Sequence, residues 1–170
     1  MMPTFDVELN ASSISKLINS LKAYQKELDG KNALFIKRLA NIGIPVIDST
    51  IARTRGDANP SHRAYVKMLP SSGNVAKCSL VLEGEDILFF EFGAGIYYNA
   101  TDPQHASKFG YGVGTYPGQT HAFDDNGWWY TDELGVSHHS YGTEATSPML
   151  RASHEIIAKI RQIAREVYAT

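Results

Sequence analysis

The sequence has one cysteine, no long apolar run and almost no excess of charge of either sign, and each shortage excludes a class of protein. Cys78 alone cannot form an internal disulfide, so a disulfide-stapled scaffold is excluded and a reducing cytosol is the expected site of synthesis. No apolar stretch approaches the roughly 20 residues that span a bilayer. The first ten residues lack the basic start and apolar core of a secretory signal. We therefore expect no targeting segment and no membrane contact.

What is present is the composition of a globular protein. The chain has 170 residues, of which 43% are hydrophobic, 20% charged and 11% aromatic. A chain of this length buries roughly 70% of its unfolded surface in a single core. It shows no internal repeat and no interdomain linker. These features predict one domain over residues 1–170, with a loop insertion at about 93–127.

Charge is distributed unevenly along the chain. Residues 83–144 contain ten acidic residues and one basic residue, Lys108, for a net charge of −9, whereas the remainder carries +7. Such asymmetry indicates partners rather than fold, because an acidic patch on one molecule attracts a basic patch on another. A solvated acidic face without a partner is the alternative interpretation.

Helical patterns occupy the first third of the chain, after a predicted short strand at 3–9. Apolar residues recur at helical spacing from Ile14 to Leu28, after the hydroxyl caps offered by Ser12 and Ser13, and Asp29-Gly30 is expected to end this helix. A second apolar series runs from about 31 to 54. Gly43 and Pro45 interrupt it, which predicts a kinked helix or two short helices.

Strand patterns follow in the middle of the chain. Residues 64–69 read as extended, and 75–83 alternate so that Cys78 lies on the apolar face, where it is a buried hydrophobe rather than a nucleophile. The turn at 84–86 predicts a hairpin between 75–83 and 87–92. Two further short strands are predicted at 128–130 and 136–141, and all of these strands are expected to join one small antiparallel sheet.

The last element is an amphipathic helix. Ser147 is the expected cap, and Pro148 occupies the first turn, where a missing amide is harmless. The apolar stripe that we expect to be buried consists of Met149, Ala152, Ile156, Ile160, Ile163 and Val167. The predicted fold class is therefore α+β, with a small antiparallel sheet packed against a long kinked helix and this C-terminal amphipathic helix. A long aromatic, glycine-rich loop completes it.

Candidate chemistry is sparse. His105, His121 and Asp124 suggest a metal-dependent hydrolase, but no HExxH or paired CxxC frame supports them, and the adjacent His138 and His139 point to opposite faces of a strand. The glycines between residues 110 and 118 open no helix and precede no Lys-Ser or Lys-Thr pair, which argues against a nucleotide loop. We predict no catalytic, cofactor or metal residues. The hydrolase and a nucleic-acid binder that uses the basic helices are the alternatives.

Two short segments resemble a known family. Glu91-Phe92-Gly93-Ala94-Gly95 precedes the long loop, and Gly142-Thr143-Glu144-Ala145-Thr146-Ser147-Pro148-Met149-Leu150-Arg151-Ala152 enters the last helix. In this order they resemble the neck and tail-completion family of tailed bacteriophages. The resemblance and the aromatic loop together single out these interface or motif residues: Glu91, Phe92, Gly93, Gly95, Tyr97, Tyr98, Tyr111, Tyr116, Trp128, Trp129, Gly142, Thr143, Pro148, Met149 and Leu150.

The resemblance implies a structural virion subunit with no enzymatic activity and no cofactor. Such subunits form a homo-oligomeric ring, sixfold or twelvefold, at the head–tail junction. Their partners are the head-closure or connector protein and the tail-tube protein, with DNA only as passing cargo, and assembly takes place in the bacterial cytoplasm. We expect the loop at 93–127 to become ordered mainly in the ring. A loop folded back on its own domain is the alternative.

Overall fold

The structure is a computed structural model that describes residues 8, 10–54, 61–70, 75–98, 103–112 and 119–169. Of the strand predicted at 3–9, only residue 8 is described. Tyr116 also lies outside the described residues. Among the described residues, no helix combines the length and apolarity needed to cross a bilayer.

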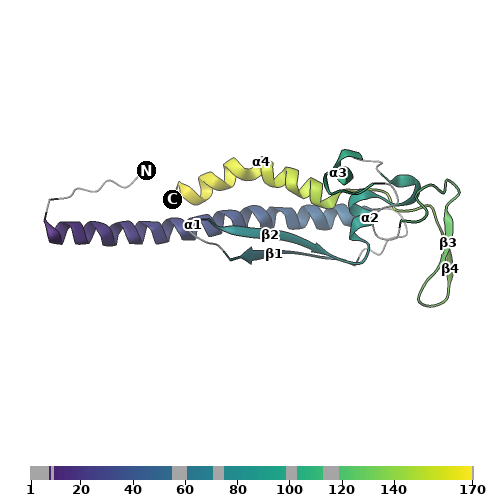
Figure 1. Cartoon of the computed structure of the whole chain (residues 1–170), viewed down its shortest axis with the longest axis horizontal. Coiled ribbons are helices and arrows are strands. Elements are labelled where there is room, and N and C mark those ends of the chain that lie inside the picture. Colours follow the sequence, from purple (N-terminus) through teal and green to yellow (C-terminus); the bar gives the residue numbers. More distant parts are fainter. Residues whose placement is uncertain are drawn as a thin grey trace.

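One helix of 41 residues, α1 (Ala11–Ile51), runs along the length of the molecule (Figure 1). Asn10, and not the predicted serine hydroxyls, caps its start, because the Asn10 Oδ1 accepts a 2.8 Å hydrogen bond from the Ser13 amide. The helix passes through Pro45 and through Asp29-Gly30, so the predicted break at Asp29-Gly30 is wrong. A glycine inside a helix costs only about 1 kcal/mol relative to alanine, and the apolar stripe keeps its phase across this point.

One helix and one pair of strands cover the C-terminal half of α1. The helix α4 (Pro148–Tyr168) runs antiparallel along it, and the strands β1 (Arg63–Leu69) and β2 (Lys77–Glu83) pack on another side (Figure 1). The core between them is formed by the buried residues Ile47, Ile51, Phe90 and Ala152. At the C-terminal end of α4, the Tyr168 hydroxyl donates a 2.6 Å hydrogen bond to the Asn32 Oδ1. This contact marks how far along α1 the cover of α4 extends.

The strands form two separate antiparallel pairs rather than the single sheet predicted. β1 pairs with β2, and β3 (Trp128–Thr131) pairs with β4 (Ser137–Ser140) near the end of the molecule remote from the start of α1 (Figure 1). The strands predicted at 64–69, 75–83, 128–130 and 136–141 are confirmed, whereas the strand predicted at 87–92, the expected partner of β2, is wrong. Residues 87–92 are the short helix α2 (Ile87–Phe92), so β2 pairs with the preceding strand instead.

The apolar stripe predicted for α4 is buried only in part. Ala152 and Val167 are buried, Met149, Ile156 and Ile163 are half-buried, and Ile160 is 41% exposed. Ile160 lies at the edge of the stripe, one turn from Ile157, which is 63% exposed. The expectation that Ile160 belongs to the core is therefore wrong.

The long excursion at 93–127 is more structured than the sequence predicts. It contains a short 3-10 helix, η1 (Gly95–Tyr97), and the helix α3 (Pro103–Lys108). Ala106 of α3 is buried against Phe92, together with the partly buried Tyr98 and Tyr111. Part of the excursion thus folds back onto its own domain, as in the alternative interpretation.

Candidate functional site

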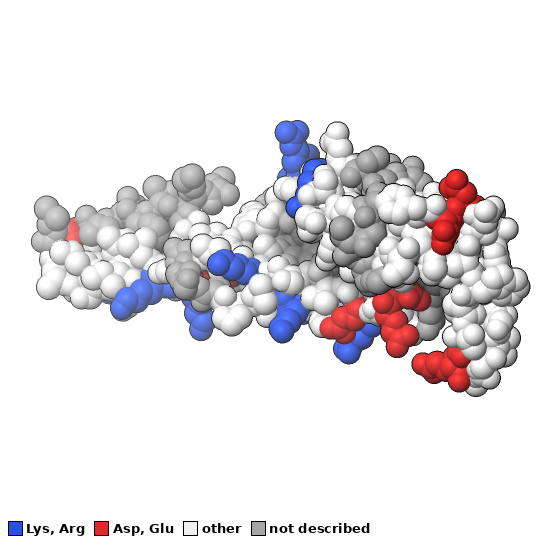
Figure 2. Space-filling model, turned by 45° about the vertical axis from the view of Figure 1, so that its right-hand side comes forward, with Lys and Arg blue, Asp and Glu red and all other residues white. Residues whose placement is uncertain are grey.

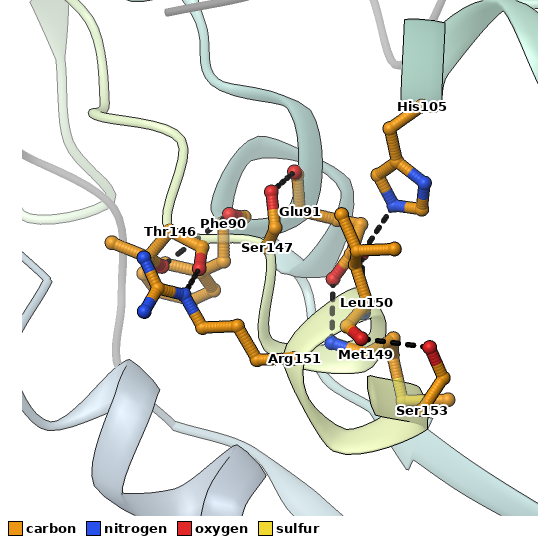
Figure 3. Close-up of polar contacts among 9 residues, drawn as sticks. All are labelled: Phe90, Glu91, His105, Thr146, Ser147, Met149, Leu150, Arg151 and Ser153. Carbon is orange, nitrogen blue, oxygen red and sulfur yellow. Dashed lines mark hydrogen bonds and ion pairs between the residues drawn. The ribbon is translucent and has the colours of Figure 1, made fainter. Parts of the chain in front are cut away.

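The two motif segments meet at a single buried carboxylate. Glu91 lies on the last turn of α2, and only 5% of its surface is exposed. Its Oε2 accepts a 2.8 Å hydrogen bond from the Met149 amide, and its Oε1 accepts one of 3.0 Å from the Leu150 amide (Figure 3). These amides belong to the first turn of α4 and have no partner within the helix. Glu91 therefore caps α4 from a different element, and its negative charge complements the positive end of the helix dipole.

A histidine from the long excursion completes this contact. The Nε2 of His105, on α3, lies 2.5 Å from the Glu91 Oε1, and both side chains are buried. An ionised carboxylate only accepts hydrogen bonds, so with Glu91 ionised the Nε2–H of His105 is the donor. The ring of His105 also packs against Phe92, with ring centroids 5.1 Å apart. One carboxylate thus joins α2, α3 and α4.

The segment that precedes α4 donates hydrogen bonds to the backbone carbonyl groups at the end of α2. The amides of Thr146 and Ser147 donate to the Phe90 carbonyl oxygen, at 2.9 and 3.0 Å. The Ser147 hydroxyl donates to the Glu91 carbonyl oxygen at 2.9 Å (Figure 3). Each helix end therefore supplies the hydrogen-bond partners that the other lacks, which prevents the loss of stability that buried, unsatisfied backbone groups would cause.

Ser147 does not cap α4 through its side chain, contrary to the prediction. Its hydroxyl is directed to Glu91 instead, and its backbone has a left-handed conformation with φ of 51° and ψ of 56°. Among the described residues it is the one non-glycine with positive φ. This conformation costs about 1–2 kcal/mol, which the surrounding hydrogen bonds must offset.

Close approach of the backbone explains two of the motif glycines. Gly95 has a φ of 62°, and a Cβ there would lie 2.6 Å from the Tyr141 carbonyl oxygen. Gly142 has a φ of 103°, and its Cβ would collide with the Ala94 carbonyl group. Between them, the Ala94 amide donates a 2.9 Å hydrogen bond to the Thr143 carbonyl oxygen. The first motif segment therefore lies directly against the second.

Most of the singled-out residues are brought together by this packing. The described ones at or next to the contact are Glu91, Phe92, Gly93, Gly95, Gly142, Thr143, Pro148, Met149 and Leu150. Trp128 approaches Gly95, whereas Trp129 lies on β3 with 71% of its surface exposed. Tyr97 is exposed, and Tyr98 and Tyr111 pack near Phe92.

The sequence does not reveal the role of His105. The sequence suggests His105 only as a metal ligand, and no neighbouring residue marks it as the partner of a carboxylate on another helix. Glu91 and His105 lie on two different helices, α2 and α3, so no periodicity within one element relates them. Only the folded excursion brings the two side chains together.

A groove of about 530 Å³ opens beside the Glu91 contact. Its walls are mostly apolar and come from α2, α3, α4 and the segment after α3. They include Leu88, Phe92, Phe109, Tyr111, Met149 and Leu150, with Glu91 and His105 also on the wall.

The histidines proposed for a hydrolase lie in two different pairs. His105 contacts Glu91, whereas the His121 Nδ1 lies 2.8 Å from the Asp124 Oδ2 at an exposed turn. Within the described residues, no group of three or more histidine, cysteine, aspartate or glutamate side chains has the spacing to hold a metal ion. The three residues therefore do not assemble into the ligand set that the alternative requires.

Cys78 lies on the face of β2 that packs against α1, as its alternation predicts, although it is half-buried rather than buried. Its thiol donates a 3.5 Å hydrogen bond to the Ile36 carbonyl oxygen. Burial raises the pKa of the Cys78 thiol, so less of the nucleophilic thiolate is present at neutral pH.

Comparisons with protein-family models, with curated proteins and with solved structures give no match to this chain. The residues and their geometry therefore carry the functional argument.

Proposed function

We propose that the chain is a structural subunit of a tailed-bacteriophage particle. It forms a ring at the head–tail junction, as a neck or tail-completion layer that links the head-closure protein to the tail tube. The proposal depends on one observation, that the segments 91–95 and 142–152 pack together around the Glu91 carboxylate. Their resemblance to the phage family is a resemblance of two separate strings of residues. Their contact supports treating them as two halves of one motif.

Surface features support an assembling protein rather than an isolated one. Large apolar side chains are exposed at both ends of the molecule, on the N-terminal half of α1 and around β3 and β4. Exposed apolar patches mark interaction surfaces, and a ring of identical subunits needs two different surfaces that meet head to tail. An acidic surface facing the channel would also keep passing DNA from adhering.

The experiment is deletion of the gene from a phage or prophage that encodes the chain, followed by electron microscopy of the particles. We expect DNA-filled heads and separate tails, with joined virions restored when the intact gene is supplied in trans. Genes for portal, head-closure and tail proteins should flank it. Normal, infectious virions after the deletion would overturn the proposal.

A matched pair of variants links this phenotype to the motif. Glu91→Ala removes the carboxylate that caps α4. Glu144→Gln removes an exposed carboxylate from the segment 142–152, which packs against Glu91. We expect only Glu144→Gln to restore joined virions.

A further inference from the structure

One face of α1 is covered by α4 in its C-terminal half, whereas no described element packs on it in its N-terminal half. Apolar residues recur at spacings of three and four from Ile14 to Leu28, and the same face continues seven residues later at Phe35 and then Leu39. We call residues 11–31 the arm, which precedes the part of α1 covered by α4 (Figure 1). The large apolar side chains exposed on the arm are Ile14, Ile18, Leu21, Tyr24 and Leu28, each 36–47% exposed.

Covering the exposed apolar stripe of the arm would stabilise this part of the helix. At 1.5 Å per residue, the arm extends about 30 Å. Helices in proteins are stabilised mainly by packing of their apolar face, and short helices without such packing are marginal in water. A second surface that covers this stripe would supply the missing stabilisation.

Charge indicates which surface this is. The arm carries four lysines against Glu27 and Asp29, a net charge of +2. Residues 119–144, which we call the acidic end, carry five acidic residues and no lysine or arginine, a net charge of −5. On the face shown in Figure 2, most acidic side chains gather at the end with β3 and β4, and basic side chains lie over the rest.

The acidic end is also rich in exposed apolar side chains. Those with at least half of their surface exposed are Phe123, Trp129, Leu134, Val136 and Tyr141. Apolar and acidic groups on this end thus complement apolar and basic groups on the arm. Two arms packed on each other would instead bring like net charges together.

We propose that the arm of one copy packs on the acidic end of a second copy. The two surfaces lie toward opposite ends of the molecule (Figure 1), so every copy can use both at once. A contact of this heterologous kind builds a ring when its rotation closes. The contact between the arm and the acidic end does not depend on the proposed function. The closure of such contacts into a ring rests on it.

The apolar part of the contact is tested with the purified full chain by sedimentation velocity over a range of concentrations. The variant Ile18→Asp/Leu21→Asp places two charges on the stripe. The control Asn19→Asp/Ala23→Asp adds the same charge on the opposite, exposed side of the arm. We expect the first pair to raise the concentration for half-assembly at least about tenfold, and the control pair to change it much less. Circular dichroism checks that both variants stay folded.

The charged part is tested by exchange of charges. Lys22→Glu/Lys26→Glu on the arm and Asp125→Lys/Glu133→Lys on the acidic end should each weaken assembly. When the four substitutions are combined in one chain, assembly should be restored, because opposite charges again face each other across the contact. Restoration identifies the acidic end as the surface that the arm meets.

The outcomes separate this proposal from the proposed function. If the wild-type chain stays monomeric up to about 100 µM, a second copy is not the occupant of the arm. If it assembles but the stripe variant assembles equally well, or the combined charge variant is not restored, the arm contact is overturned and the ring stands. If the arm contact holds but gene deletion leaves normal virions, the proposed function alone is wrong.

Discussion

A single carboxylate positions three helices in this protein. Glu91 accepts hydrogen bonds from two backbone amides of α4 and from the imidazole of His105, and only 5% of its surface is exposed. Hydrogen bonds to charged groups contribute more to stability than neutral ones, and unsatisfied buried donors are costly.

The substitution Glu91→Gln tests this role. The side-chain amide brings a donor to a site where all neighbours donate, so we expect the free energy of unfolding to fall by about 2 kcal/mol. Urea denaturation followed by circular dichroism measures it. The exposed Glu144→Gln should change the same quantity by less than about 0.5 kcal/mol. Equal effects of the two substitutions would contradict the cap.

Local sequence rules could not identify this cap. Ser147 has the hydroxyl and the following proline that typically start a helix, and the helix does start there. The residue that caps α4 is Glu91, however, which precedes Met149 by 58 residues. No local sequence pattern indicates a contact over that separation.

At the scale of elements, long periodic segments were predictable and short apolar runs were not. The 3.6-residue stripe of α4 and the alternation of β2 each indicate one structure only. Residues 87–92 are apolar at five of six positions, a pattern that fits a buried helix as well as a buried strand. The break expected at Asp29-Gly30 failed because one glycine inside a helix costs only about 1 kcal/mol relative to alanine, too little to end a helix that continues on both sides of it.

The β3–β4 hairpin is held by a side chain in its turn. The Asp132 carboxylate accepts hydrogen bonds from the His138 ring at 2.9 Å and from the amides of Val136 and Leu134 at 2.8 and 2.9 Å. The His138 contact foremost, and then these amides, hold the pKa of Asp132 below its ordinary value of 3.8. Asp132 therefore stabilises the hairpin fully above that ordinary pKa, and its contribution is lost as the pH falls through the lower folded value.

We expect the hairpin to loosen in acid through this group. Fluorescence of Trp128 and Trp129 should report the change below about pH 4. In Asp132→Asn the carboxylate is absent, so this acid transition should disappear. An identical transition in the variant would assign the acid sensitivity to another group.

At the scale of the whole molecule, stability is distributed unevenly along its length. The body places α1 between α4 and the β1–β2 pair, whereas the arm has an exposed apolar face. Regions with few buried apolar contacts open more readily than the core.

Hydrogen exchange measures this difference along one helix. In dilute, monomeric protein we expect amides at 11–28 to exchange at least about 100-fold faster than those at 39–51. In the assembled state the arm should gain protection. Equal protection of both halves in the monomer would show that the arm is stabilised without a second copy.

The crossing of Gly95 and Gly142 also bears on how such a protein can diversify. The chain leaves the body and returns to it at two points joined by the Ala94–Thr143 hydrogen bond, and between them the excursion is held a second time where His105 and Ala106 contact Glu91 and Phe92. Doubling the length of a flexible loop costs only about 0.6 kcal/mol in closure entropy. Changes of length within the excursion should therefore cost little, whereas the turn of helix that carries His105 and Ala106 must keep its contacts with Glu91 and Phe92.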